Sequence, residues 1–404
     1  MSVLCIFSLI AALLAGAGIG QALAGLRTVR RFAAEPGLRC AIQPRLTLLK
    51  PLYGDEPMLE EALASVCAQD YPDYQIVFGV QDEADPAISV VRALQERFPE
   101  RDIDLVVNSA QYGRNRKVSN LINMLPVAKH DLLVIADSDL HCAPDYLIRI
   151  VAEFAAPNTG LVTTLYAGRA ANRSLAARLG ASAINHGFVP GALMSRDLGR
   201  EDCLGASMAL RRDTLVRIGG LPALVDHLAD DNVLGQRVRG LGLKIRIADT
   251  VPATTVPEHT LGALFSHELR WSRTILSLVP VAFALSSIQF PLFWSLLAVV
   301  LSQSVWAVGL FFVVWLVRAL VCVGIDHTLG LVRVERATAV SWLLLPLRDI
   351  LSIAIILASY VSDRVEWRGQ MMHTRPNEPL ATEFPRDLTR DPTRASAPQG
   401  TVLS

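Results

Sequence analysis

The sequence has no excess of charge of either sign, and it lacks the cysteine pattern of a disulfide-bonded or zinc-binding protein. Its 38 basic and 38 acidic residues balance, so no net field attracts nucleic acid or an acidic partner. The six cysteines include no C-x-x-C pair, and the eight histidines are scattered. We therefore expect no nucleic-acid partner, no structural zinc site and a reducing, cytosolic setting for the central domain.

Charged residues are absent above all from the beginning of the chain. Residues 3–26 carry no charge, and a membrane-spanning helix needs about 20 apolar residues. Residues 1–27 are therefore predicted to form an uncleaved transmembrane anchor. A cleaved signal peptide is the alternative, but the segment has no Lys or Arg before its apolar run. Arg27, Arg30 and Arg31 follow the anchor and place the next domain in the cytosol by the positive-inside rule.

A second region with few charges begins near residue 275. Residues 275–324 are long enough for two spans, or for one span and an interfacial helix, and a further apolar stretch at 339–361 contains Arg348 and Asp349. We expect a C-terminal membrane region at 275–363 with two to three helices. The last residues, 374–404, are rich in Pro, Thr and charge and are expected to be disordered.

Residues 40–274 have the alternating strand and helix pattern of an α/β domain. Strand-like runs occur at RLTLLKP, YQIVFGV, IDLVV and DLLVIA, with segments of helical spacing between them. This order predicts a Rossmann-like, mostly parallel sheet that binds ligands at the carboxyl ends of its strands. The polar residues that follow the strands are therefore candidate site residues: Lys50, Asp82, Asp137 and Asp139.

Asp137 and Asp139 are predicted to bind a divalent metal ion. Residues i and i+2 of a strand point the same way, and two carboxylates aimed at one point repel each other unless a cation lies between them. Mg²⁺ or Mn²⁺, shared with a substrate diphosphate, suits such oxygen ligands. A solvated turn is the alternative interpretation, because Asp and Ser are favoured in turns.

Five more residues have both a functional and an ordinary interpretation. Lys117 and Asn120 lie about one helical turn apart, so both could face the cleft, with Lys117 covering a phosphate; a solvated helix face is the alternative. Asp230 and Asp231 stand at the start of a predicted helix, where acids and caps are favoured anyway. The position of Asp82 at the end of a neighbouring strand favours a contact with the nucleotide, and a turn acid before Pro86 is the alternative.

The polar stretch FSHELRWSRT, residues 265–274, directly precedes the C-terminal apolar region. Its basic and aromatic residues could anchor the chain at the membrane surface. They could instead belong to an active site that has to lie at the membrane.

Six motifs, in this order, resemble the ceramide glucosyltransferase-like glycosyltransferases: KPLYGDEP, VQDEADPAI, NRKVSNLINML, IADSDL, LADDN and HELRW. The resemblance covers about residues 45–275 and implies a GT-A catalytic domain flanked by transmembrane helices. Within this family, the sequence is most similar to the bacterial branch that glycosylates hopanoid lipids. The similarity lies in the segments QIVFGVQDEADPAISVVRALQ, RKVSNLINMLP and HELRWSRT. It therefore implies a multi-pass enzyme of the bacterial inner membrane.

The resemblance implies a role for each acid that matches a family motif. Asp82 corresponds to the first acid, near the uracil and ribose of a UDP-sugar. Asp137 corresponds to the second acid, in the metal and diphosphate motif, with Asp139 as its companion. Asp231 corresponds to the third, the catalytic base, and Asp230 stands where relatives often have Glu.

The basic and aromatic residues receive roles in the same way. Arg270 and Trp271 match the end of the family motif (Gln/Arg)-x-x-Arg-Trp and are expected to act in catalysis. His267 occupies the first position of that motif, where it departs from the family pattern, so an ordinary donor contact and an acceptor-specific role both stay open. We assign Lys50, Lys117 and His267 to donor binding.

The implied reaction is the inverting transfer of a sugar from a UDP-sugar to a hydroxyl group of a membrane lipid. The preferred donor is UDP-N-acetylglucosamine, and the preferred acceptor is bacteriohopanetetrol. A carboxylate base would take the hydroxyl proton, and Mg²⁺ or Mn²⁺ would stabilise the leaving UDP. A ceramide glucosyltransferase using UDP-glucose is the main alternative. A processive polysaccharide synthase would need more spans, and the three acids argue against a non-catalytic binding protein.

Overall fold

The computed structural model of the chain describes residues 3–38, 40, 42–330, 342–367, 370–373 and 402–403. Among these, the chain forms two compact units. The sheet unit contains the described residues of Gly37–Leu165, Glu201–Pro252 and Pro376–Ser404, and the membrane unit contains those of Met1–Pro36, Tyr166–Arg200 and Ala253–Arg375. The disorder expected for 374–404 lies outside the described residues, apart from 402–403.

The sheet unit is built on an eight-stranded sheet with the order β13-β3-β2-β1-β4-β8-β6-β9. Strands β3, β2, β1 and β4 run parallel to one another, whereas β8 runs antiparallel to both β4 and β6. The predicted mostly parallel α/β sheet is therefore confirmed. The βα alternation did not predict the antiparallel β8 inside the sheet or the antiparallel β13 at its edge. The bounds are β1 Leu46–Pro51, β2 Tyr74–Val80, β3 Asp102–Val107, β4 Leu132–Ala136, β5 Leu140–His141, β6 Thr159–Thr164, β8 Ser207–Arg211, β9 Lys244–Ala248 and β13 Val402–Leu403.

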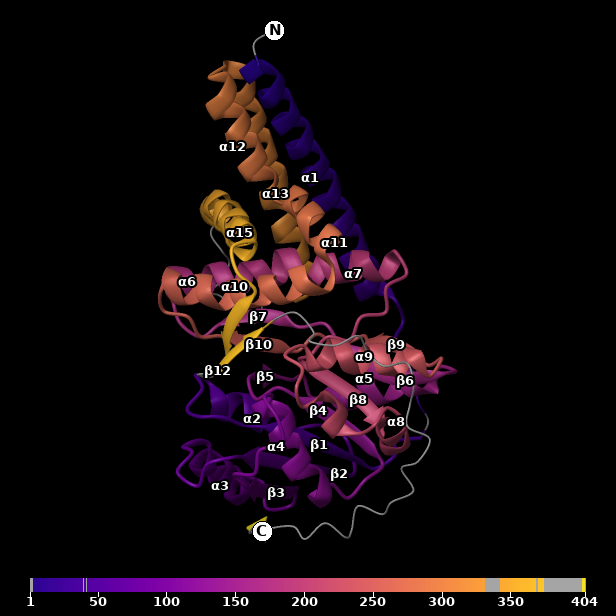
Figure 1. Ribbon diagram of the computed structural model, residues 1–404. Coiled ribbons are helices and arrows are strands. Elements are labelled where there is room, and N and C mark those ends of the chain that lie inside the picture. The colour runs from indigo at the N-terminus through magenta and orange to yellow at the C-terminus, as the bar shows by residue number, and fades with distance from the viewer. Residues whose placement is uncertain are drawn as a thin grey trace. The chain divides into compact units, whose positions relative to one another are not determined.

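Helices accompany this sheet (Figure 1), and every residue of β1, β2 and β4 is buried. Such burial explains why these strands are mostly apolar rather than alternating, and their few polar residues, Thr47, Lys50 and Gln75, are buried as well. The α-helices of the unit are α2 Leu59–Cys67, α3 Ala87–Arg97, α4 Arg116–Met124, α5 Tyr146–Ala152, α8 Arg212–Arg217 and α9 Asp230–Gly240. Short 3₁₀ turns are η1 Leu125–Val127, η2 Glu153–Ala155 and η4 Leu221–Leu224.

The register of the central strands determines where the polar residues emerge. Lys50 of β1 is paired with Phe78 of β2, and Leu49 is paired with Ile135 of β4. The three strands therefore end at nearly the same level. Because they are parallel, the residues that follow β1, β2 and β4 come out at one edge of the sheet.

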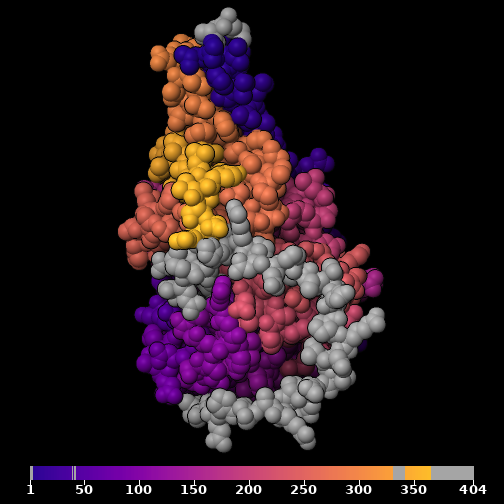
Figure 2. All heavy atoms as spheres, viewed as in Figure 1, coloured from indigo at the N-terminus to yellow at the C-terminus, as the bar shows by residue number. Residues whose placement is uncertain are grey.

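The membrane unit contains three helices that are long and apolar enough to cross a membrane: Val3–Ala34, Val305–Thr328 and Trp342–Ser359. The described residues give a fourth span if Pro280–Gln289 and Pro291–Ser302, bent by 67°, are counted as one. These helices identify a membrane protein. Figure 2 shows the atoms of α1 and α12 packed against each other within this unit.

Small residues allow α1 to approach its neighbours. A Cβ at Gly18 would lie 2.4 Å from the main-chain oxygen of Ile288, and Ala11 and Ala15 on the same helix are buried. Such small residues let backbones pack closely in a membrane, where no hydrophobic effect drives helices together.

The remaining elements of the membrane unit include a continuous run of helix from residue 175 to 197. Its middle turn, η3, is a π-helix. The helices are α1 Val3–Ala34, α6 Leu175–Ala183, η3 Ile184–Phe188, α7 Val189–Asp197, α10 Leu261–Leu278, α11 Pro280–Leu285, η5 Ser286–Gln289, α12 Pro291–Ser302, α13 Val305–Thr328, η6 Trp342–Leu344 and α15 Leu345–Ser359. Strand β7 Ala167–Ala170 pairs in parallel with β10 Ala253–Val256, and β11 Arg364–Trp367 pairs antiparallel with β12 Gln370–His373.

The two charges of α15 are buried and have partners. Arg348 forms two 2.7 Å hydrogen bonds with the carboxylate of Glu268. Asp349 Oδ2 accepts a hydrogen bond from the main-chain N–H of Leu292, at the start of α12. A charged side chain in a membrane is far less costly when it is paired inside the protein, so these residues are compatible with a membrane helix.

Candidate active site

Lys117 and Asp137 lie at the centre of the candidate site in the sheet unit. Lys117 Nζ is 2.5 Å from Asp137 Oδ1 and 3.5 Å from the main-chain oxygen of Gly205. Burial by itself would lower the pKa of Lys117, but the nearby charges of Asp137 and Asp230 raise it above its usual value. The lysine is therefore positively charged, and it supplies a fixed cation at the end of β4.

Lys50 holds the backbone of the same Asp-x-Asp motif through a hydrogen bond. Its side chain is fully buried, and Nζ donates a 2.8 Å hydrogen bond to the main-chain oxygen of Asp137. Burial lowers the pKa of Lys50, while the charges of Asp139 and Asp137 oppose that shift. Lys50 thus fixes the backbone of the Asp137–Asp139 turn, and a direct contact with the donor stays a prediction.

The middle residue of the Asp-x-Asp motif is also held in place. Ser138 is buried, and its hydroxyl donates a 2.5 Å hydrogen bond to Glu56 Oε2. The serine side chain therefore points into the protein, and metal binding by the two acids on either side stays a prediction. Asp137 and Asp139 on either side are both half-buried.

Helix α9 begins with Asp230 and Asp231. The residue at the N-cap position is Ala229, so neither acid is the cap and both occupy the first helical turn. Asp230 is buried, and its Oδ1 accepts a 3.2 Å hydrogen bond from the side-chain amide of Asn115. Asp231 is half-buried, and its Oδ1 accepts from the main-chain N–H of Asn232 at 2.7 Å.

The environment of Asp231 gives it the proton affinity of a general base. Burial, followed by the charge of Asp230, raises the pKa of Asp231 to about 7, and the charge of Lys117 opposes the rise. Burial also raises the pKa of Asp230. A carboxylate that titrates near neutral pH is suited to accept a proton from a hydroxyl group.

Two residues that the sequence analysis did not single out build this corner of the site. A Cβ at Gly205 would lie 2.7 Å from Asp231 Oδ2, so a larger residue there would force that carboxylate to shift. Asn115 is the N-cap of α4, where its side-chain oxygen accepts from Val118 N at 3.0 Å. Its amide also donates to the main-chain oxygen of His227 at 2.8 Å. An asparagine directly before a helical segment is a recognisable N-cap signal, but its second partner, 112 residues away, is not.

Asp82 lies in the loop after β2. It is exposed, and its Oδ1 accepts from the main-chain N–H of Ala84 at 2.9 Å, within its own turn. The buried acid of this loop is Asp85, whose two carboxylate oxygens accept from the main-chain N–H of Gly54 at 3.1 and 3.0 Å. A role for Asp82 at the uracil or ribose stays a prediction.

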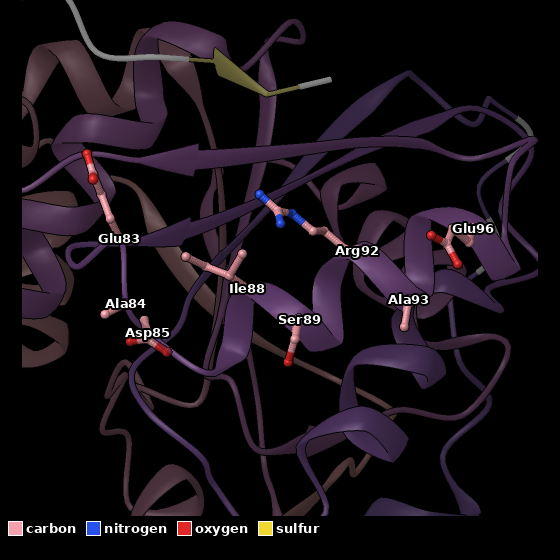
Figure 3. A pocket seen from close by; sticks show the side chains of 8 residues that line it. All are labelled: Glu83, Ala84, Asp85, Ile88, Ser89, Arg92, Ala93 and Glu96. Atoms are coloured by element: carbon pink, nitrogen blue, oxygen red, sulfur yellow. The ribbon is translucent and has the colours of Figure 1, made fainter.

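A shallow hollow lies beside this loop and along one face of α3. Figure 3 shows Glu83 and Arg92 on opposite sides of Ile88 there. None of the residues predicted to bind donor or metal lines it; the lining residues are Glu83, Ala84, Asp85, Ile88, Ser89, Arg92, Ala93 and Glu96. We therefore assign no substrate to this hollow.

Asp137 and Asp139 can bind a divalent metal ion only together with further ligands, which the substrate would supply. Within the described residues, no group of three or more His, Cys, Asp or Glu side chains is arranged to hold a metal ion. Asp137 and Asp139 offer two carboxylates, and Mg²⁺ commonly uses one or two carboxylates together with substrate phosphates and water. The donor set is therefore chemically suitable once a diphosphate contributes its oxygens.

The His-x-x-Arg-Trp motif lies on α10 in the membrane unit. Thr260 caps this helix, because its side-chain oxygen accepts from Ala263 N at 3.2 Å. The ring of His267 contacts Trp271 edge-on, with the centroids 4.4 Å apart, and its Nδ1 is hydrogen-bonded to Glu258 Oε1. The sequence analysis did not predict Glu258, because it lies nine residues before the histidine and outside any helix.

The predicted site residues therefore fall into two sets. Lys117 contacts Asp137 directly and shares a charge environment with Asp230 and Asp231. Lys50, Asp82 and Asp139 belong to the same sheet unit, whereas His267, Arg270 and Trp271 belong to the membrane unit.

The sequence profile of glycosyl transferase family 21 matches residues 10–380 of the chain. Ceramide glucosyltransferase 1 of Caenorhabditis elegans is 21% identical over 246 residues, which are 61% of this chain and 53% of that protein. The ceramide glucosyltransferase of Komagataella phaffii is 34% identical over 110 residues, 26% of this chain and 22% of that protein. The chain thus spans about half the length of the first relative, and less of the second.

Among solved structures, the fold is similar to that of a mannosyltransferase from Pyrobaculum calidifontis in complex with GDP-Man and Mn²⁺. The TM-score is 0.51 at 20% identity, and the match covers 87% of this chain and 99% of the other. At this level of identity the likeness concerns the fold, and it supports the GT-A architecture of the sheet unit.

Proposed function

The chain belongs to glycosyl transferase family 21, and we propose that it transfers a sugar from a UDP-sugar to a hydroxyl group of a membrane lipid. The observation that carries this proposal is the charge cluster of the sheet unit. Asp137, Asp230 and Asp231 surround the cation of Lys117 at the carboxyl end of the sheet, in a chain with membrane-spanning helices.

Asp231 is the proposed general base. As the acceptor oxygen attacks the anomeric carbon, its proton passes to the Asp231 carboxylate, and the bond from that carbon to UDP breaks with the electron pair leaving on the diphosphate. Attack from the face opposite UDP inverts the anomeric centre. The raised pKa of Asp231 matches this role, because a base works best when its pKa lies near the operating pH.

The leaving diphosphate requires positive charge. Lys117 provides a buried ammonium group beside Asp137, and Arg270 is the proposed cation of the membrane unit. Asp137 and Asp139 would hold Mg²⁺ or Mn²⁺, which when bound neutralises the charge that develops on the diphosphate. Trp271 is the proposed contact for the sugar or the acceptor.

The proposed donor is UDP-N-acetylglucosamine, and the proposed acceptor is bacteriohopanetetrol in a bacterial inner membrane, with the sheet unit on the cytosolic side. The amino-acid sequences of the motifs support this choice of donor and acceptor, because they resemble those of the hopanoid branch. The alternative is transfer of glucose from UDP-glucose to ceramide, which the names of the relatives from Caenorhabditis elegans and Komagataella phaffii support.

A substrate panel tests the proposal. Detergent-purified protein is offered UDP-glucose or UDP-N-acetylglucosamine with either ceramide or bacteriohopanetetrol, and the lipid products are identified by mass spectrometry. We expect N-acetylglucosaminyl bacteriohopanetetrol with a β linkage. Glucosylceramide as the main product would favour the alternative, and no glycolipid from any of the four combinations would contradict lipid glycosylation by this chain.

A further inference from the structure

Glu258 is a buried acid of the membrane unit that none of the proposed steps uses. It lies between the end of β10 and the start of α10, and its side chain is only 7% exposed. The backbone around it is fixed by the loop before α6. Ser174 Oγ donates to the main-chain oxygen of Glu258 at 2.8 Å, and the Asn172 amide donates to that of Pro257 at 3.2 Å.

The contact of Glu258 with His267 determines which ring nitrogen carries a proton. Burial by itself would raise the pKa of Glu258, but its hydrogen bond with His267 and the charge of Arg270 lower it below its usual value. An ionised carboxylate only accepts hydrogen bonds, so His267 Nδ1 must carry the proton and donate it. In the neutral ring, Nε2 is then an acceptor.

Glu258 therefore influences the whole motif. It binds His267 directly, its carboxylate interacts with the charge of Arg270, and His267 in turn packs edge-on against Trp271. The rings of His267 and Trp271 are partly open to solvent, with exposures of 31% and 36%. The buried carboxylate thus supports a surface that a ligand can reach.

We propose that Glu258 is the positioning residue of this motif: it fixes His267 with the proton on Nδ1, so that Nε2 accepts a hydrogen bond from a hydroxyl of the lipid acceptor. A hydroxyl group can donate to Nε2, whereas a diphosphate offers only acceptor oxygens. Because the sugar and ribose of the donor also carry hydroxyl groups, acceptor KM and UDP-sugar affinity are measured separately to distinguish the two sources. The inference assigns His267 to acceptor recognition instead of donor binding. It rests on the proposed transfer to a lipid hydroxyl.

A double-mutant cycle tests whether Glu258 acts through His267. Glu258→Gln, His267→Gln and the double variant are compared with the unaltered protein for acceptor KM, kcat and UDP-sugar affinity. We expect each single change to lower kcat/KM for the acceptor about tenfold, the effect of one lost hydrogen bond to a positioned group. The double variant is expected to be no worse than His267→Gln, while UDP-sugar affinity changes less than about twofold.

Glu268→Gln is the matched control, because Glu268 is a carboxylate next to His267 on α10 whose partner is Arg348. It is expected to lower thermal stability and leave the acceptor KM unchanged. Multiplicative losses in the Glu258–His267 cycle, or a loss confined to UDP-sugar affinity, would overturn the inference while lipid glycosylation stands.

A second measurement does not depend on activity. In protein labelled with ¹⁵N-histidine, the signals of His267 are those that disappear in His267→Gln. We expect them to show the tautomer with the proton on Nδ1, and to change in Glu258→Gln. A protonated Nε2 in the unaltered protein would overturn the inference even if the chain glycosylates none of the lipids offered.

Discussion

At the residue scale, the candidate site depends on how one lysine offsets several acids. Lys117 lies 2.5 Å from Asp137, and its charge also opposes the rise in the pKa of Asp230 and Asp231. Buried carboxylates are costly unless a cation or hydrogen bonds compensate them. At Asp231, burial and the charge of Asp230 outweigh this compensation and raise the pKa to about 7, so this carboxylate is able to take up a proton near neutral pH.

Replacing Asp231 with Asn removes the proposed base and keeps its size. We expect the turnover number for sugar transfer to fall by about 100-fold or more, with UDP-sugar affinity retained. Turnover on a defined lipid and equilibrium binding of the donor measure the two quantities. Asp213→Asn is the control, since Asp213 is an acid in the first turn of another helix of the sheet unit. Turnover within threefold of the unaltered protein would contradict the assignment.

Gly205→Ala tests the space beside Asp231. The new Cβ would lie 2.7 Å from Asp231 Oδ2, so the carboxylate has to rotate away. We expect turnover to fall at least about tenfold, as for other displacements of a catalytic group, with the thermal unfolding temperature little changed. In Gly240→Ala, the control, the added Cβ meets no other described atom within 4 Å. Equal activity of the two variants would show that the position of Asp231 is not critical.

The pH dependence should respond to Asp230. Its negative charge raises the pKa of Asp231, so Asp230→Asn should lower that pKa. The base works when deprotonated, and kcat/KM therefore rises as the pH increases through its pKa in the free enzyme. In Asp230→Asn this rise should occur at lower pH, as a full pH profile of kcat/KM would show. An unmoved or higher-pH limb would rule out this coupling.

At the scale of elements, an ion pair joins two helices of the membrane unit. Arg348 of α15 binds both carboxylate oxygens of Glu268 on α10 and also donates to the main-chain oxygen of Leu179 on α6 at 3.3 Å. A bidentate arginine–carboxylate pair fixes the orientation of both groups. It thereby links α15 to the helix that carries His267, Arg270 and Trp271.

Arg348→Met would remove this partner of Glu268, whose carboxylate would stay mostly buried. We expect a loss of about 3–5 kcal/mol of stability, typical of breaking one side of a buried pair, seen as a lower apparent unfolding temperature in detergent. The double variant Arg348→Met/Glu268→Gln should be more stable than Arg348→Met alone, because no unpaired charge is left. A double variant less stable than either single variant would contradict this account.

The elements also differ in how far their sequences predict them. The runs that form β1, β2 and β4 are apolar at nearly every position and are separated by helical spacing, so both their existence and their parallel order can be inferred. Strand β8 is a short apolar run whose antiparallel pairing with β4 and β6 depends on distant partners. The π-turn at Ile184–Phe188 has no periodic signal.

At the scale of the whole molecule, the membrane unit is made from three separate segments of the chain. Residues 166–200 and 253–274 belong to this unit together with the terminal helices, although they lie within the stretch 40–274 that was expected to form the catalytic domain. The acids around Lys117 and the His-x-x-Arg-Trp motif are therefore carried by different units. We propose that transfer requires both.

Removing divalent metal tests the cofactor assignment on the intact protein. With EDTA, we expect sugar transfer to fall at least about tenfold, because the leaving diphosphate loses its main counter-charge, and added Mg²⁺ or Mn²⁺ should restore it. EDTA already saturated with Mg²⁺ is the control for effects of the chelator itself. Full activity in metal-free chelator would exclude the proposed role of Asp137 and Asp139.

The sequence by itself determined the charge-free membrane segments, the βα alternation and the strand-end acids, because each is a local pattern of hydrophobicity or spacing. Only the tertiary structure decided which of these residues are partners. Lys117 meets Asp137, Glu258 meets His267, and Arg348 meets Glu268. Burial and side-chain direction create these pairs, and both depend on how distant segments pack. The role of His267 follows from such a pair, since a buried carboxylate determines which of its nitrogens can accept a hydrogen bond.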